Sequence, residues 1–186
     1  MRELLNNESV DRGLRRVAGE ILERHERATN IVLVGVRRGG VPLAEKISHW
    51  LERLDGAAPP LGSVDITLYR DDAATAMPNP RIGPSAIPVS LEQKTVILVD
   101  DVLFTGRTIR AALDALLDYG RPHQIELAVL VDRGGRELPI QPDYVVRSVE
   151  VGPSERVDVR STSKGTVVVA VHSSSPSMPP EMLEPQ

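Results

Sequence analysis

The segment TVILVDDVLFTGRTIRAAL (95–113) constrains the fold more than any other stretch of the chain. Four consecutive β-favouring residues, 96–99, predict a strand that is buried on both faces. Apolar residues then recur at helical spacing from Ile109 to Leu117, so a helix is expected to follow. Two adjacent carboxylates, Asp100 and Asp101, and a Thr-Gly turn separate the two elements. The segment therefore predicts a strand–loop–helix unit with polar groups at the carboxyl end of the strand.

Strand and helix patterns alternate along most of the chain. Amphipathic periodicity predicts a helix over 9–25 and, within 37–54, a turn on Gly39 and Gly40 that continues as a second helix. Apolar runs predict strands over 30–36, 64–69, 125–135, 144–151 and 166–174. This order of elements predicts an α/β fold with an open, mainly parallel central sheet flanked by helices. In such sheets the ligand crevice lies beyond the carboxyl ends of the strands. The two Gly-rich turns and the aspartate pair are all expected at those ends.

Length and composition fit one compact domain. The chain has 186 residues, 41% of them hydrophobic, and we assign residues 1–172 to a single domain. The tail 173–186 is rich in serine and proline and is expected to be disordered. The segment 71–88 contains four prolines, and a loop of this length in a compact domain is often functional, so we expect a mobile lid there.

The charge balance limits the classes of partner. A formal net charge of −4 argues against a global attraction to nucleic acid or an anionic membrane, so any RNA contact has to be local. The chain has no cysteine, which excludes disulfides and thiolate chemistry. Its start, MRELLNNESVDRG, lacks the apolar core of a signal peptide, so we expect a cytoplasmic protein.

The TGRT turn (105–108) has the chemistry of a phosphate site. Backbone N–H groups, two threonine hydroxyls and the positive end of the following helix would together bind an anion. Asp100 and Asp101 would repel a phosphate, so they are expected to address sugar hydroxyls or a hydrated Mg²⁺ ion. A phosphorylated sugar would supply both a phosphate for the turn and hydroxyl groups for the aspartates. In the alternative interpretation, the aspartates only cap a turn.

The segment VILVDDVLFTGRT resembles the phosphoribosyl pyrophosphate (PRPP) motif of the type I phosphoribosyltransferases. Three further segments, DITLYRDD, DALLDYGRP and LVDRGGRELPI, resemble the pyrimidine-operon regulatory proteins of that family. Those regulators are similar to uracil phosphoribosyltransferases and also bind messenger RNA. The likeness runs from residue 9 to about 172 and implies the type I phosphoribosyltransferase fold.

The resemblance implies a role for each matching residue at the sugar and phosphate sites. Asp100 and Asp101 would hold the ribose hydroxyls and count as catalytic together with Arg70, which would close over the reaction with the lid. The implied PRPP-binding residues are Arg37, Arg38, Gly39, Asp100, Asp101, Val102, Leu103, Phe104, Thr105, Gly106, Arg107 and Thr108. Many family members have Thr-Arg-Gly where this chain has Arg38-Gly39-Gly40. A plain strand-to-helix turn with solvated arginines is the alternative there.

The resemblance also implies the remaining partners. Asp132, Arg133 and Val157 would lie beside the base, and Mg²⁺ would come with PRPP and water rather than with dedicated protein ligands. The implied function is conversion of uracil and PRPP to uridine monophosphate (UMP), with UMP or UTP also controlling binding to the leader messenger RNA of pyrimidine genes. A homo-oligomer, a dimer or larger, is expected.

The RNA face is the part of the resemblance with the most departures. The implied RNA-binding residues are Arg15, Arg16, Arg136, Arg147 and Arg156. Gly19 stands where many members have histidine, and residues 148–155 differ from the usual Pro-Thr-Ser stretch. Ordinary solvated arginines are one alternative. Another is a uracil or purine salvage phosphoribosyltransferase with no RNA-binding role.

Overall fold

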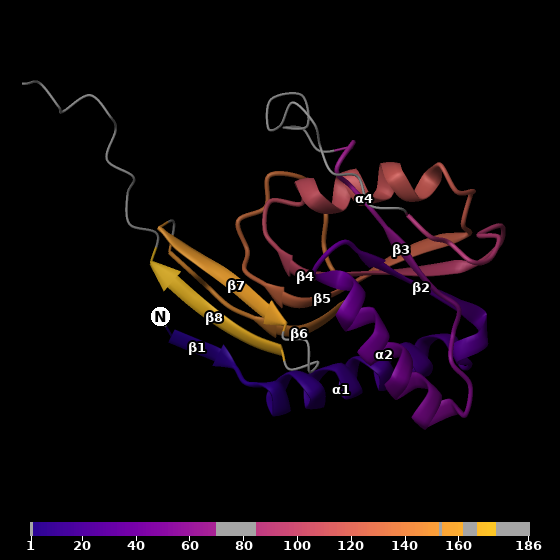
Figure 1. Ribbon diagram of the computed structural model, residues 1–186, viewed down its shortest axis with the longest axis horizontal. Helices are drawn as coiled ribbons and strands as arrows, with labels where there is room; N and C mark the ends of the chain where they lie inside the picture. Colours follow the sequence, from indigo (N-terminus) through magenta and orange to yellow (C-terminus); the bar gives the residue numbers. More distant parts are fainter. Residues whose placement is uncertain (1, 70–84, 153, 162–166, 174–186) are drawn as a thin grey trace, which may run out of the picture.

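A five-stranded parallel sheet forms the centre of the computed structural model, which describes residues 2–69, 85–152, 154–161 and 167–173 (Figure 1). Its strand order is β3-β2-β4-β5-β6. The strands are β2 (Ile31–Val36), β3 (Leu61–Val64), β4 (Thr95–Leu103), β5 (Gln124–Asp132) and β6 (Tyr144–Ser148). All four pairings are parallel, as the alternating pattern predicted. The carboxyl ends of the strands therefore meet at one edge.

Helices cover both faces of this sheet and form two cores. The helices α1 (Asn7–His25) and α2 (Gly40–Asp55) pack on one face, and α4 (Arg107–Leu117) packs on the other (Figure 1). A short 3₁₀ helix, η1 (Ala28–Asn30), joins α1 to β2. Asn6 caps α1 by accepting the Ser9 N–H at 2.9 Å. The three helices confirm the sequence predictions to within a few residues.

A second, antiparallel sheet lies beside the first and was not predicted. It has the order β1-β8-β7, with β1 (Arg2–Leu5), β7 (Glu155–Ser161) and β8 (Val167–Ser173). The segment ERVDVRS of β7 alternates Val157 and Val159 with charged residues, so its period of two was a readable signal. β1 has only four residues, which is too short for a periodic pattern.

The predicted strand over 64–69 is wrong. The strand β3 ends at Val64, and Asp65 begins a turn in which its carboxylate accepts the N–H of Thr67 at 2.9 Å and also the Thr67 hydroxyl. Such a local bond to the backbone competes with a strand ladder. The alternation in VDITLY therefore survives only as the burial of Val64 and Ile66.

Two expectations concern parts of the chain outside the described residues. Arg70 and most of the expected lid fall in 70–84, and the expected disordered tail is almost all in 174–186. Within the described remainder of the loop, Ala86 makes an isolated antiparallel bridge with Ser63. Among the described helices none is long and apolar enough to cross a membrane.

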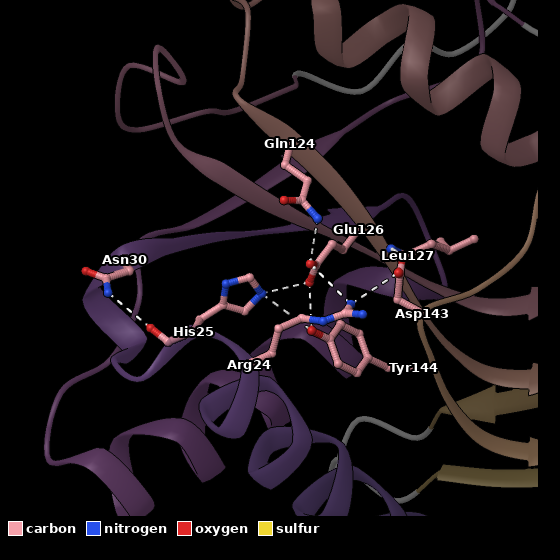
Figure 2. A network of polar contacts seen from close by, with 8 residues as sticks. All are labelled: Arg24, His25, Asn30, Gln124, Glu126, Leu127, Asp143 and Tyr144. Atoms are coloured by element: carbon pink, nitrogen blue, oxygen red, sulfur yellow. Dashed lines mark hydrogen bonds and ion pairs between the residues drawn. The ribbon is translucent and has the colours of Figure 1, made fainter.

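A buried polar cluster joins α1 to the amino end of the sheet (Figure 2). The Glu126 carboxylate is 1% exposed and accepts hydrogen bonds from the Tyr144 hydroxyl (2.7 Å), Arg24 (3.2 Å) and Gln124 (2.9 Å). The His25 Nε2 lies 2.8 Å from the same carboxylate. Burial and the bond to Glu126 raise the pKa of Tyr144. The titratable cluster is therefore fully occupied by internal contacts, at the edge opposite the predicted site.

We predict that Glu126→Ala lowers the free energy of unfolding by about 3 kcal/mol or more, because it leaves several buried donors without an acceptor. Urea denaturation measures this change, and Glu150→Ala, at an exposed glutamate, is the matched control. Turnover by the folded fraction should be unchanged. Lost turnover at unchanged stability would contradict a purely structural cluster.

Candidate active site

The carboxyl end of β4 carries the two aspartates. Asp100 is 4% exposed, and its carboxylate accepts the N–H of Asp101 at 2.9 Å. Asp101 is less buried and accepts the N–H of Val102 at 2.8 Å. Burial, together with the neighbouring charge of Asp101, raises the pKa of Asp100 well above its ordinary value. The protein thus holds an ionisable group at this edge at a cost in stability.

The loop after β4 leads directly into the N-terminus of α4. Gly106 adopts a positive φ of 92° immediately before Arg107, the first residue of the helix. The Arg107 N–H lies 3.3 Å from the Thr105 hydroxyl, and its guanidinium pairs with Glu137 at 2.7 Å. Thr108 is exposed in the first turn. This is the strand–loop–helix geometry that the TGRT pattern predicted, and a helix N-terminus placed in this way can bind an anion.

The segment after β5 binds backbone carbonyl groups of Leu103, the last residue of β4, and of the loop 104–106, which we call the phosphate loop after its predicted role. The Arg133 N–H donates to the Leu103 carbonyl at 3.1 Å. The N–H groups of Glu137 and Leu138 both donate to the Thr105 carbonyl, at 3.0 and 3.1 Å. A free carbonyl near a phosphate would repel it, so these bonds remove an electrostatic obstacle to an anion. Nothing in the local sequence of either segment indicated this contact.

The turn after β2 lies against the aspartate pair. A Cβ atom on Gly39 would lie 2.1 Å from the Asp101 Oδ2 atom, and one on Gly40 would lie 2.0 Å from the Val99 carbonyl. Only glycine permits this approach. Arg37 and Arg38, joined by a cis peptide bond, are exposed. The structure therefore brings the glycine turn after β2 into direct contact with the carboxyl end of β4.

On the predicted base side, the side chains of Asp132 and Arg133 make contacts within the protein. Both oxygens of Asp132 are used internally, accepting the Gly134 N–H at 2.9 Å and an Arg136 N–H at 2.7 Å. The Arg133 guanidinium lies 4.0 Å from the centre of the Phe104 ring and donates to the Glu155 carbonyl. Burial lowers the pKa of Arg133. Asp132 thus shapes a turn.

Val157, the third residue predicted at the base, lies in β7 opposite Val171 of β8. It is partly buried, and it packs against the core on the α1 side of the sheet. The strand β7 contacts the turn after β5, which we call the base turn after its predicted role, through its backbone. There the Glu155 carbonyl accepts a hydrogen bond from Arg133.

Comparison with known proteins decides the family. The sequence model of the phosphoribosyl transferase domain family matches residues 1–162 of this chain. A protein of Geobacter sulfurreducens named bifunctional protein PyrR is 56% identical over 156 residues, covering 84% of this chain and 88% of the relative. A protein of the same name from Thermoanaerobacter sp. is 51% identical over 157 residues, with the same coverage of both chains. The chain belongs to the PyrR family of phosphoribosyltransferases.

Solved structures of other phosphoribosyltransferases share the fold. A hypoxanthine phosphoribosyltransferase from Staphylococcus aureus superposes with a TM-score of 0.63 at 19% identity, covering 83% of this chain and 80% of that one. The likeness confirms the predicted type I phosphoribosyltransferase fold. At this level of identity it carries no information about the base.

The arginines proposed to bind RNA lie in unlike surroundings. Arg15 and Arg16 help to line an open groove of about 440 Å³ on α1 and α2, together with Arg12, Gly19 and Leu54. Arg15 lies over the Trp50 ring at 5.4 Å. Arg16 pairs with Glu20 and donates to the Val145 and Val146 carbonyls of β6. Arg147 and Arg156 are exposed on β6 and β7.

Arg136 differs from the sequence expectation, because it is not on an exposed basic face. Its side chain is 13% exposed, and its guanidinium is bound to Asp132 and to backbone carbonyls. An arginine whose donors are already bonded inside the protein has little left for an RNA phosphate.

The described residues of this family member contain no cluster of three or more histidine, cysteine, aspartate or glutamate side chains that could hold a metal ion. The donors at the site are the two carboxylates on β4. Such a donor set fits Mg²⁺, which is usually bound by one or two carboxylates together with substrate phosphates and water.

We predict that Asp100→Asn stabilises the protein at neutral pH. Because burial raises the folded-state pKa, the stabilising contribution of protonated Asp100 is fully present below the ordinary value of 3.8 and is lost as pH rises through the raised pKa. The neutral amide removes that loss, so urea denaturation at pH 7 should give a higher free energy of unfolding. Asp101→Asn, which removes only the neighbouring charge, should give a smaller increase. An unchanged pH profile in Asp100→Asn would contradict this origin of the pKa shift.

Proposed function

We propose that this chain transfers the phosphoribosyl group of PRPP to uracil, releasing UMP and pyrophosphate, and that it also binds the leader RNA of pyrimidine genes under the control of uridine nucleotides. The observation that carries the proposal is the identity of about 50% with bifunctional PyrR proteins over most of both chains. The phosphate loop, the aspartate pair and the glycine turn that meet at one edge support the enzymatic half.

The sugar phosphate would occupy the edge between β2 and β4. The N-terminus of α4 and the loop 105–108 would bind the 5′-phosphate, while Asp100 and Asp101 would accept hydrogen bonds from the ribose hydroxyls. The pyrophosphate would lie toward the turn 37–40, where two exposed arginines supply positive charge. Arg107 would exchange Glu137 for the phosphate.

The reaction needs positioning more than a protein nucleophile. The bond between C1 of the ribose and the pyrophosphate oxygen breaks, a bond from C1 to a uracil nitrogen forms, and the proton of that nitrogen passes to solvent water or to the released pyrophosphate. Positive charge that develops on the ribose ring is favoured by the nearby carboxylates. Mg²⁺, arriving with PRPP, would neutralise the charge of the leaving pyrophosphate. The turn after β5 would place the base beside C1.

The RNA face is proposed on the groove of α1 and α2. Arg15 supplies a positive charge beside the aromatic surface of Trp50, with Arg53 at 5.6 Å from the same ring. Arginine and aromatic surfaces together bind unpaired RNA bases and phosphates. Arg147 of β6 and Arg156 of β7 stay in the proposal as exposed arginines, although the two strands belong to different sheets. Arg16 serves the packing of α1 on β6 instead. The expected homo-oligomer and the cytoplasmic location stay predictions.

We predict that the double variant Asp100→Asn/Asp101→Asn keeps its fold and loses uracil-dependent pyrophosphate release by about 100-fold or more, since it removes the charge facing the ribose. Asp114→Asn, at an exposed aspartate of α4, is the control and should keep full activity. A substrate panel of uracil, hypoxanthine and guanine tests the base. Turnover of a purine in place of uracil would favour a purine salvage enzyme.

We predict that Arg15→Ala weakens binding of a pyrimidine-leader RNA and reduces the slope of log K against log salt by about 1, as expected for the loss of one phosphate contact. Arg121→Ala, at an exposed arginine between α4 and β5, is the control. UMP should strengthen RNA binding, and the RNA should strengthen UMP binding by the same factor. A wild-type protein indifferent to leader RNA at low salt would leave only the enzyme.

A further inference from the structure

Arg136 connects the two halves of the candidate site. Its Nη1 atom donates to the Phe104 carbonyl at 3.0 Å, in the middle of the phosphate loop. Its Nη2 atom donates to the Asp132 carboxylate at 2.7 Å, at the start of the base turn. Its Nε atom donates to the Ile140 carbonyl at 2.9 Å. One guanidinium therefore bonds the loop after β4, the end of β5 and the connection to β6.

A side chain, and not a backbone group, binds the Phe104 carbonyl. Leu103 and Thr105 receive backbone N–H groups from the segment after β5, but the carbonyl between them, that of Phe104, receives the Arg136 guanidinium. The Asp132 carboxylate is held from both sides, by the Gly134 N–H and by Arg136. Both partners of the ion pair are largely shielded, at 13% and 19% exposure, so water screens the pair little.

The Phe104 ring contacts the same turn. It lies under the Arg133 guanidinium, and a Cβ atom on Gly135 would lie 2.5 Å from its Cε2 atom. The backbone carbonyl of Phe104 is held by Arg136, while its ring contacts the turn Arg133–Gly135. Any shift of the turn relative to the phosphate loop would break several of these contacts at once.

We infer that Arg136 is a positioning residue that sets the distance between the phosphate subsite and the base subsite of the proposed transferase. This inference rests on the proposed function for the identity of the subsites. A planar guanidinium with donors in three directions can hold all three partners, whereas a lysine ammonium is a single point of charge. Arg136 touches neither substrate in this scheme.

The consequence concerns ligands that span both subsites. A nucleoside monophosphate puts its phosphate in the loop and its base on the turn, so its affinity depends on the spacing of the two. Ribose 5-phosphate occupies only the phosphate side. Loss of Arg136 should therefore weaken binding of the nucleotide much more than binding of the sugar phosphate.

The test compares Arg136→Gln and Arg136→Lys with wild type by calorimetry, using ribose 5-phosphate and the nucleoside monophosphate that binds wild type best among UMP, CMP, IMP and GMP. We expect both variants to lose about 10-fold or more in nucleotide affinity, with less than about a twofold change for ribose 5-phosphate. Arg121→Gln is the matched control. Melting temperatures show whether each variant is folded.

Three results would overturn the inference: equal weakening of both ligands, no weakening of either, or full rescue by lysine. If Arg136→Gln fails to fold, Arg136→Lys and Asp132→Asn, which each leave part of the link, give the same comparison. A wild type that prefers IMP or GMP would contradict the proposed base, but it would leave the comparison valid for that nucleotide. The two failures are therefore distinct.

Discussion

Parallel pairing of β4 with β2 on one side and β5 on the other is the constraint on which the site depends. Because the three strands run in the same direction, the turns that follow them all emerge at one edge. The glycine turn after β2 reaches the carboxylates of β4, and the segment after β5 covers the phosphate loop. Gly39 and Asp101, which lie 62 positions apart in the chain, thus become neighbours.

The same edge concentrates the energetic costs of function. Asp100 is a buried carboxylate with a second carboxylate beside it, an arrangement that opposes its ionisation. An anion bound at the predicted phosphate loop would need its amide groups, and the carbonyls of Leu103, Phe104 and Thr105 are already bonded to the segment after β5. Sites of this kind are expected to trade stability for binding.

The opposite edge shows how similar chemistry can serve a different purpose. Glu126, His25 and Tyr144 form a buried titratable cluster that composition alone would not separate from an active site. Its donors and acceptors satisfy one another, and it lies where the last turn of α1 meets the first residues of β5 and β6 (Figure 2). Position relative to the strand direction distinguishes the two edges.

The sequence by itself determined the alternation of strands and helices, the parallel sheet and the strand–loop–helix unit around the TGRT turn, because each follows from local periodicity or from a motif of adjacent residues. Its resemblance to the phosphoribosyltransferases also identified the family. The pattern misjudged VDITLY, where a side chain of Asp65 ends the strand, and it passed over β1 and β7. Only the tertiary structure decided the surroundings of Arg136. The sequence suggested an exposed arginine of an RNA face, whereas its side chain is largely buried between the phosphate loop and the turn after β5. Its partners come from three segments that meet only when the sheet has formed, and no local pattern encodes such a contact.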